Sequence, residues 1–268
     1  MQEPLVPTLS RVSQAVLAAT LAAAAPAFAA SSATATAGAV SITLFDLNPA
    51  DGLAPSLTFF GESSASYAYA NGTSASDIAS GLNADSAVSL NVPLVSVAGS
   101  TSANGAFGQA AASGDGSGNW LGGDGQGVFF ASFEVGAWTG VLIEMSYAGT
   151  ASTTVGFDSS WNGEAASSTI SVLLNVFGAD GQETHTATRN LYASSVWDGN
   201  AYSGENLSFN GNLRLTYANL SDDTLSGSYV TSAYAYAASA VAAVPEPGTY
   251  ALMLAGLAAV AGFARRRR

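Results

Sequence analysis

Few residues in this chain could carry out catalytic chemistry. His185 is the one histidine, and the 268 residues contain no cysteine and no lysine. His185 could serve as a general base, but no Gly-x-Ser-x-Gly nucleophile elbow accompanies it. The absence of lysine excludes Schiff-base and P-loop chemistry, and one histidine without cysteine excludes an ordinary zinc or copper site. We therefore expect His185 to be an exposed or half-exposed strand residue.

Carboxylates are the other chemical candidates. Glu134 and Glu144 lie on neighbouring predicted strands, and two carboxylates facing one cleft could hydrolyse a glycoside. Oxygen-rich, glycine-containing loops could bind calcium, and the weak candidates are Asp180, Glu183, Asp222 and Asp223. No segment has a complete EF-hand or nonapeptide pattern, and Asp-Gly pairs also form ordinary turns. We expect no catalytic residue, no enzymatic activity and no cofactor, with calcium as the alternative.

Aromatic and threonine residues suggest binding instead of catalysis. Four tryptophans lie near predicted loops, where they could stack on sugar rings or plug the ends of a β-sandwich: Trp120, Trp138, Trp161 and Trp197. Thr184, Thr186 and Thr188 form one short row of the kind that an ice-binding surface repeats many times. Carbohydrate binding and, behind it, ice binding are therefore alternative functions.

Period-two alternation of apolar residues predicts the strands that must position these side chains. Strands are expected at 40–44, 64–70, 87–92, 128–135, 141–148, 168–177, 183–191, 212–217 and 225–241. Residues 178–181 predict a hairpin in which Gly181 has a positive φ, and 219–223 predict a turn. Residues 98–127, rich in glycine, serine and alanine, predict a long flexible loop. The whole pattern predicts an all-β, antiparallel, jelly-roll-like sandwich.

The charge of this predicted domain is extreme. The chain has 19 acidic residues and 7 arginines, and all but two acids (Glu3 and Glu246) lie within 30–244. Only Arg189 and Arg214 are basic there, so the domain has a formal net charge of about −15. Such a surface repels nucleic acid and anionic lipid. We expect no nucleic-acid partner and a soluble extracellular domain.

The last residues have a different composition. Pro245, Glu246 and Pro247 precede an uncharged apolar run at 249–264, and the sequence closes with Arg265, Arg266, Arg267 and Arg268. As a helix the run would be about 24 Å long, slightly short of a hydrocarbon core of about 30 Å. Arginines resist translocation and should stay cytoplasmic, and the prolines disfavour helix before the run. A short membrane anchor preceded by an accessible extended segment is expected.

This order of Pro-Glu-Pro, apolar span and arginine block resembles the PEP-CTERM sorting signal of Gram-negative bacteria, also labelled an ice-binding-protein C-terminal domain. The resemblance covers about 25 residues. It implies recognition by an exosortase, a cysteine-protease-like membrane transpeptidase, with cleavage near Pro-Glu-Pro and transfer to the cell surface. It also implies an association with exopolysaccharide production, and hence a biofilm matrix.

The other end of the sequence is consistent with export. An apolar run at 16–25 follows Arg11, and Ala27 and Ala29 fit a small-residue signal-peptidase site with cleavage before Ala30. The expected organisation is a signal peptide (1–29), a β-sandwich (30–241), a linker with Pro-Glu-Pro (242–248), a transmembrane helix (249–264) and a cytoplasmic arginine cluster (265–268). We expect an exported, transiently anchored surface or matrix protein with a structural or adhesive role, or alternatively a carbohydrate-binding module.

Overall fold

A computed structural model describes residues 30–82, 84–115, 117–155, 163–179, 181–194, 196–197, 202–241 and 255–256. Residues 29–242 make up one compact unit of the chain. Within the described residues, no helix has the length and apolarity that crossing a bilayer requires. The predicted signal peptide lies outside them, as does the predicted membrane span except for 255–256.

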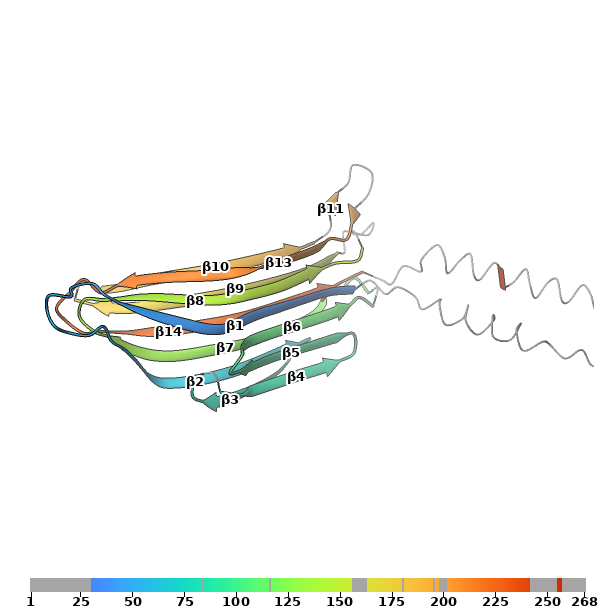
Figure 1. The fold of residues 1–268 in the computed structure, drawn as a ribbon. Coiled ribbons are helices and arrows are strands. Elements are labelled where there is room, and N and C mark those ends of the chain that lie inside the picture. The colour runs from blue at the N-terminus through green and yellow to red at the C-terminus, as the bar shows by residue number, and fades with distance from the viewer. Residues whose placement is uncertain are drawn as a thin grey trace, which may run out of the picture. The chain divides into compact units, whose positions relative to one another are not determined.

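The larger unit is built from antiparallel strands (Figure 1). Their bounds are β1 (Ala30–Asp46), β2 (Leu57–Ala70), β3 (Thr73–Ser80), β4 (Ser86–Val92), β5 (Val95–Ser102), β6 (Gly105–Ser113), β7 (Leu121–Val135), β8 (Thr139–Ser152), β9 (Glu164–Gly178), β10 (Gly181–Ala193), β11 (Val196–Trp197), β12 (Tyr202–Ser203), β13 (Asn206–Ala218) and β14 (Leu225–Ser239). The predicted turn at 219–223 and the β9–β10 hairpin are confirmed, and Gly181 has φ 120°.

Two six-stranded sheets pack face to face. One sheet has the order β13-β8-β1-β6-β5-β4, and the other has the order β10-β9-β14-β7-β2-β3. Contacts between the sheets join β13 to β10, β8 to β9, β1 to β14, β6 to β7, β5 to β2 and β4 to β3. The predicted antiparallel β-sandwich is therefore confirmed, while the jelly-roll-like character stays a prediction.

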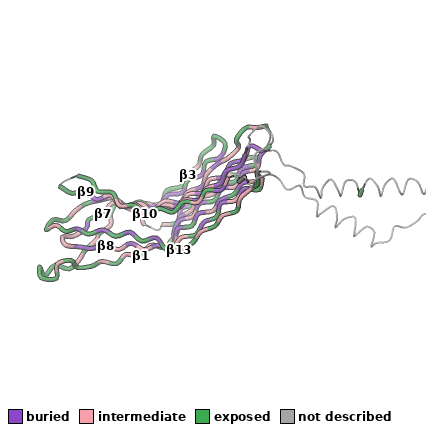
Figure 2. Tube along the Cα trace, turned by 90° about the horizontal axis from the view of Figure 1, so that it is seen from above, coloured by how far each residue is buried: buried purple, intermediate pink, exposed green. Residues whose placement is uncertain are grey.

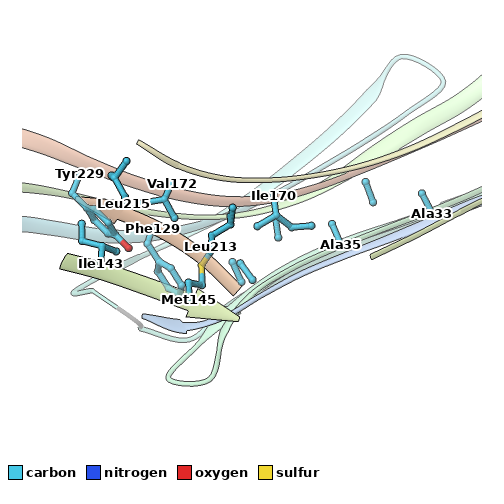
Figure 3. Packing of buried hydrophobic residues seen from close by; sticks show 14 of the residues in the cluster. Ala33, Ala35, Phe129, Ile143, Met145, Ile170, Val172, Leu213, Leu215 and Tyr229 are labelled. Carbon is cyan, nitrogen blue, oxygen red and sulfur yellow. The ribbon is translucent and has the colours of Figure 1, made fainter. Parts of the chain in front are cut away.

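Buried residues alternate with more exposed residues along the strands, as Figure 2 shows. One set of side chains therefore lies inside the sandwich and the other set points outward. Far from Ala30 the interior is filled by large side chains, among them Phe129, Phe133, Ile143, Met145 and Tyr229. Figure 3 shows Phe129, Ile143, Met145 and Tyr229 of this group apart from the smaller Ala33 and Ala35. The core thus changes in side-chain size along the length of the strands.

Toward Ala30 the interior consists mainly of alanine and glycine, with Val95 and Val97 as larger apolar residues. Buried alanines come from both sheets: Ala33, Ala35, Ala106, Ala110, Ala233, Ala235 and Ala237. A Cβ atom on Gly99 would lie 2.2 Å from the carbonyl oxygen of Gln126, and one on Gly127 would lie 2.1 Å from that of Ser100. Real Cβ contacts are essentially never under 3.0 Å, so the two backbones approach too closely for any side chain.

This close approach corrects one prediction. Residues 98–127 do not form a long loop, because they contain most of β5, all of β6 and the start of β7. Many of their small residues face inward, where only small residues fit between the sheets: Gly99, Ala106, Gly108, Ala110, Ala112, Gly123, Gly125 and Gly127. The small side chains that suggested a flexible segment are those that a thin sandwich requires.

The first and last strands meet at this thin end. The Ser31 hydroxyl donates a hydrogen bond of 2.9 Å to the carbonyl oxygen of Ala238, and Ala240 N donates to the carbonyl oxygen of Gly163 at 3.0 Å. Residues 30 and 241, where the sandwich begins and ends, therefore lie at the same end of the fold. The loops at 47–56, 136–138 and 219–224 lie at the opposite end.

Candidate functional site

The outer face of the second sheet carries a group of aromatic residues that we call the tyrosine face: Tyr67, Tyr69, Tyr192, Tyr234 and Tyr236. Tyr67 and Tyr69 are 41% and 46% exposed. They are separated by one buried residue on β2, and Tyr234 and Tyr236 are spaced in the same way on β14. Because side chains alternate along a strand, each Tyr-Ala-Tyr segment presents both rings on the outer face.

The strand register brings these rings together. Tyr69 and Tyr236 are both opposite Asp124 on β7, the strand between β2 and β14. Two residues further along, Tyr67 and Tyr234 are both opposite Gln126. Neighbouring strands lie about 4.8 Å apart, so four tyrosines surround one carboxylate and one amide.

The first of these rows continues to the edge of the sheet. Tyr236 is also paired with Ser167 on β9, which is paired in turn with Tyr192 on β10. At the thin end, a hollow of ≈ 460 Å³ adjoins the row. Its lining includes Tyr69, Asn71, Trp120, Asp124 and Tyr236. Flat rings, hydrogen-bonding groups and a shallow hollow make an amphipathic surface.

Burial and neighbouring charge affect the ionisation of this group. Burial raises the pKa of Asp124. The pKa of Tyr234 is raised to about 12, mainly by burial and to a smaller extent by the charges of Asp124 and Tyr236. The pKa of Tyr236 rises through burial and the charges of Tyr192 and Asp124. Tyr234 and Tyr236 are therefore neutral hydrogen-bonding groups near neutral pH, and the Asp124 carboxylate beside them is partly desolvated.

The sequence contained a signal for this surface. Tyr-Ala-Tyr occurs at 67–69 and again at 234–236, each time within a strand that the alternation predicted. What could not be recognised was the strand between them, because residues 121–127 fell within the predicted loop. Trp120, which is 53% exposed, lies near this surface as a loop residue, as expected.

The structure separates the two glutamates considered for glycoside hydrolysis. Glu134 lies on the outer face of the second sheet, opposite Ser226 and Thr58. Glu144 lies on the outer face of the first sheet, where its Oε1 is 2.6 Å from Nε of Arg214. The two carboxylates face solvent on opposite sides of the sandwich and share no cleft.

His185 is half-buried on the edge strand β10. Its Nε2 lies 3.5 Å from Oε2 of Glu183, and its ring packs edge-on against Tyr217 with centroids 5.1 Å apart. This is the half-exposed strand position expected from the sequence. Thr184, Thr186 and Thr188 line the outer side of the same strand, and their partners on β9 are Asn175, Leu173 and Ser171. The threonine row is therefore one strand wide.

Among the described residues, the calcium candidates do not come together in one cluster of metal-ligating side chains. No group of three or more histidine, cysteine, aspartate or glutamate side chains in those residues could hold a metal ion. Asp222 instead accepts a hydrogen bond of 2.8 Å from Nε1 of Trp138, and Glu183 contacts His185. Asp180 lies outside the described residues.

The predicted processing residues mostly lie outside the described residues as well. This holds for Ala27, Ala29, the sorting residues Pro245, Glu246 and Pro247, and the arginine block Arg265, Arg266, Arg267 and Arg268. Trp161 is also outside them. Ala30 is described as the first residue of β1, so the expected signal cleavage coincides with the start of the sandwich.

Comparison with known proteins identifies the tail. The model of the PEP-CTERM protein-sorting motif matches residues 243–268. No curated protein and no solved structure matches the chain. The match covers Pro245, Glu246, Pro247 and the arginine block, which are the residues that carried the resemblance in the sequence. The chain therefore carries a PEP-CTERM protein-sorting motif at residues 243–268.

Proposed function

We propose that this chain is an exported protein, processed by an exosortase, whose mature sandwich has a structural or adhesive, non-catalytic role at a Gram-negative cell surface or in its exopolysaccharide matrix. The observation that carries this proposal is the sorting motif at residues 243–268. Its apolar run and arginine block suit a transient anchor in the inner membrane. The acidic domain suits an aqueous extracellular location.

The layout of the sandwich supports a surface role. The strand ends that lead to the two termini lie together at the thin end. At the opposite end, large apolar side chains are exposed: Leu53 is 58% exposed and Leu220 is 67% exposed, with Phe45 at 47%. Exposed apolar side chains gathered at one end of a domain are typical of a contact surface. An anchored chain could thus present its far end to a partner.

Mass spectrometry of the surface-released protein tests the processing. We expect a first residue of Ala30 and loss of the apolar tail with Arg265–Arg268. A variant with Pro245, Glu246 and Pro247 replaced by alanine should retain its tail and remain with the membrane. Recovery of intact Arg268 on the released form would contradict processing.

Glycan binding is a second candidate, and the tyrosine face is the observation that favours it. Sugar rings have apolar faces that stack on aromatic rings, and hydroxyl groups that pair with side chains such as Asp124 and Gln126. The four central tyrosines offer both kinds of contact on one surface. The ligand would be a polysaccharide of the surrounding matrix.

A polysaccharide pull-down distinguishes glycan binding from a purely structural role. Replacing Tyr69 and Tyr236 together by alanine should weaken retention by at least about tenfold. Phe60→Ala is the matched control, because Phe60 lies on the same strand and the same face with the same 46% exposure as Tyr69, but opposite Ser132 and away from the tyrosines. Equal losses in both variants would argue against a specific site.

A further inference from the structure

Asp124 occupies the centre of the tyrosine face without an opposite charge. It forms no ion pair and no side-chain hydrogen bond within the described residues, where Arg189 and Arg214 are the two basic side chains. Arg214 contacts Glu144 on the other sheet, and Arg189 donates to the carbonyl oxygen of Thr188. The carboxylate is thus partly desolvated between aromatic rings and lacks a cation.

The surroundings of Asp124 suit an ammonium group. Tyr69 and Tyr236 flank it, one strand away on each side. Trp120 and Asn71 line the same hollow. Aromatic faces attract cations, and a carboxylate adds a charge-assisted hydrogen bond. A ligand with an ammonium group would provide the missing charge while its apolar parts covered the rings.

We propose that the tyrosine face binds a glycan whose units carry free amino groups, with Asp124 as the acceptor for the ammonium. This inference rests on the second candidate function, glycan binding, and adds the chemical class of the glycan. The strongly acidic domain favours the same choice, because it repels polyanionic chains and attracts cationic ones. The open hollow would hold one sugar unit of a chain that crosses the sheet.

Two oligosaccharide probes of equal length test the proposal on the detergent-solubilised full chain. Glucosamine oligomers should bind at least about tenfold more tightly than N-acetylglucosamine oligomers, since acetylation removes the charge. Asp124→Asn should abolish this preference. Glu134→Gln is the matched control, because Glu134 lies on the same strand and the same face but away from the tyrosines, and it should retain the preference.

The outcomes separate the two claims. Equal binding of both probes, or a preference that survives Asp124→Asn, overturns the amino-group assignment and leaves glycan binding intact. Absence of binding to either probe and to matrix polysaccharide, by a protein that unfolds cooperatively, overturns glycan binding itself.

A different observation carries a second inference, at the thin end. Glu164 is 1% exposed. Its Oε2 accepts hydrogen bonds from the backbone nitrogens of Thr154 and Val155, at 2.6 and 3.0 Å, and its two carboxylate oxygens lie 3.4 and 3.3 Å from the Thr154 hydroxyl. That hydroxyl also accepts a hydrogen bond of 2.9 Å from the backbone nitrogen of Ala30. Ala30 N is therefore two hydrogen bonds away from a buried carboxylate.

We propose that the new amino terminus of the mature protein is linked to this carboxylate through the Thr154 hydroxyl. Hydrolysis of the bond between Ala29 and Ala30 adds water, leaving a carboxylate on the signal peptide and an ammonium on Ala30. The ammonium would donate to Thr154 Oγ1, which can donate in turn to Glu164. This inference rests on signal cleavage before Ala30, and it means that cleavage supplies a positive charge near the buried Glu164.

The absence of lysine makes a clean test possible. Acetylation by an amine-selective reagent can modify only the α-amino group of the exported protein, and hydroxylamine removes any hydroxyl ester. Acetylation should lower the melting temperature by about 2–4 °C. Thr154→Val, which keeps the shape but removes the hydroxyl, should abolish the effect, as should Glu164→Gln if that variant folds. Equal melting of acetylated and free forms, or the same shift in Thr154→Val, overturns the proposal.

Discussion

A Cβ atom on Gly125 would lie 2.0 Å from the carbonyl oxygen of Ala98, which belongs to the opposite sheet. The two backbones are therefore in direct contact across the thin end, with no side chain between them. Ordinary stacked sheets are kept about 10 Å apart by their side chains. The stability of this end depends on close packing of backbone and methyl groups, and any added atom must push the sheets apart.

Gly125→Ala should accordingly be among the most destabilising single substitutions. Overpacking ordinarily costs about 1–3 kcal/mol, and here the clash is with backbone that cannot rotate away, so we expect about 3 kcal/mol or more. Chemical denaturation measures the change. Gly178→Ala is the control, since the nearest atom to its added Cβ would be 3.9 Å away. A loss at Gly125 no larger than at Gly178 would mean that the sheets are further apart than described.

Asn219 should be the critical side chain of the opposite end. It is 1% exposed, and its Nδ2 donates to the carbonyl oxygens of Gly136 and Asp223 at 2.9 and 2.8 Å. Its Oδ1 accepts from the backbone nitrogen of Ser221 at 3.1 Å. Asn219→Ala leaves these backbone groups unpaired and should cost about 2–3 kcal/mol in thermal unfolding. Asn210→Ala, at an exposed position of β13, should cost less than about 0.5 kcal/mol.

Tyr229 should make the fold sensitive to alkali. Burial raises its pKa to about 12, although the hydrogen bond from Thr231 lowers it in part. The folded-state pKa is above the unfolded value of about 10, so the stabilisation is complete below pH 10 and is lost as the pH rises toward 12. The loss from this one group is about 2–3 kcal/mol.

Unfolding at several alkaline pH values measures this dependence. Tyr229→Phe should flatten the decline between pH 10 and 12, while at neutral pH it should cost about 1 kcal/mol for the lost hydrogen bond. An unchanged alkaline decline in Tyr229→Phe would assign the sensitivity to other tyrosines, with Tyr234 first among them.

The sequence predicted the strands whose inward side chains are large. Ile170, Val172, Leu174 and Val176 alternate strongly, and all four are buried on β9. The same alternation exists at Gly123, Gly125 and Gly127, but glycine carries no apolar signal, so that strand appeared to be a loop. The glycines at alternate positions, between polar residues, could have indicated a strand here. Glycine in a strand often marks a close approach of another backbone.

The site was less predictable than the strands. Each Tyr-Ala-Tyr segment placed two rings on one face, but the two segments are separated by more than half of the chain. Their convergence on Asp124 depends on the order β14-β7-β2 and on a register shift in β2 between Phe60 and Ser63. Side-chain periodicity determines which face a residue occupies, whereas strand order is a property of the whole fold.

Asp124 should reduce stability in the absence of a ligand. Burial raises the pKa of its carboxyl group, so the stabilisation linked to it is complete below the unfolded pKa of about 3.9 and is lost as the pH rises through the folded value. At neutral pH the ionised group is partly desolvated without a partner. Asp124→Asn should therefore raise the melting temperature at pH 7, and the gain should shrink as the pH falls through the folded pKa and be absent below about pH 4.

Calorimetry of both proteins over this pH range measures the effect, with Glu134→Gln as the control that should melt like the parent. The comparison also bears on the binding site, because residues kept for a ligand commonly cost stability when the ligand is absent. We expect Asp124→Asn to be more stable and to bind glucosamine oligomers and their acetylated forms equally. This result would show that the Asp124 side chain both lowers stability and recognises the amino group. If Asp124→Asn melts at a lower temperature than the parent at pH 7, the carboxylate has a stabilising partner and is not held ready for a cation.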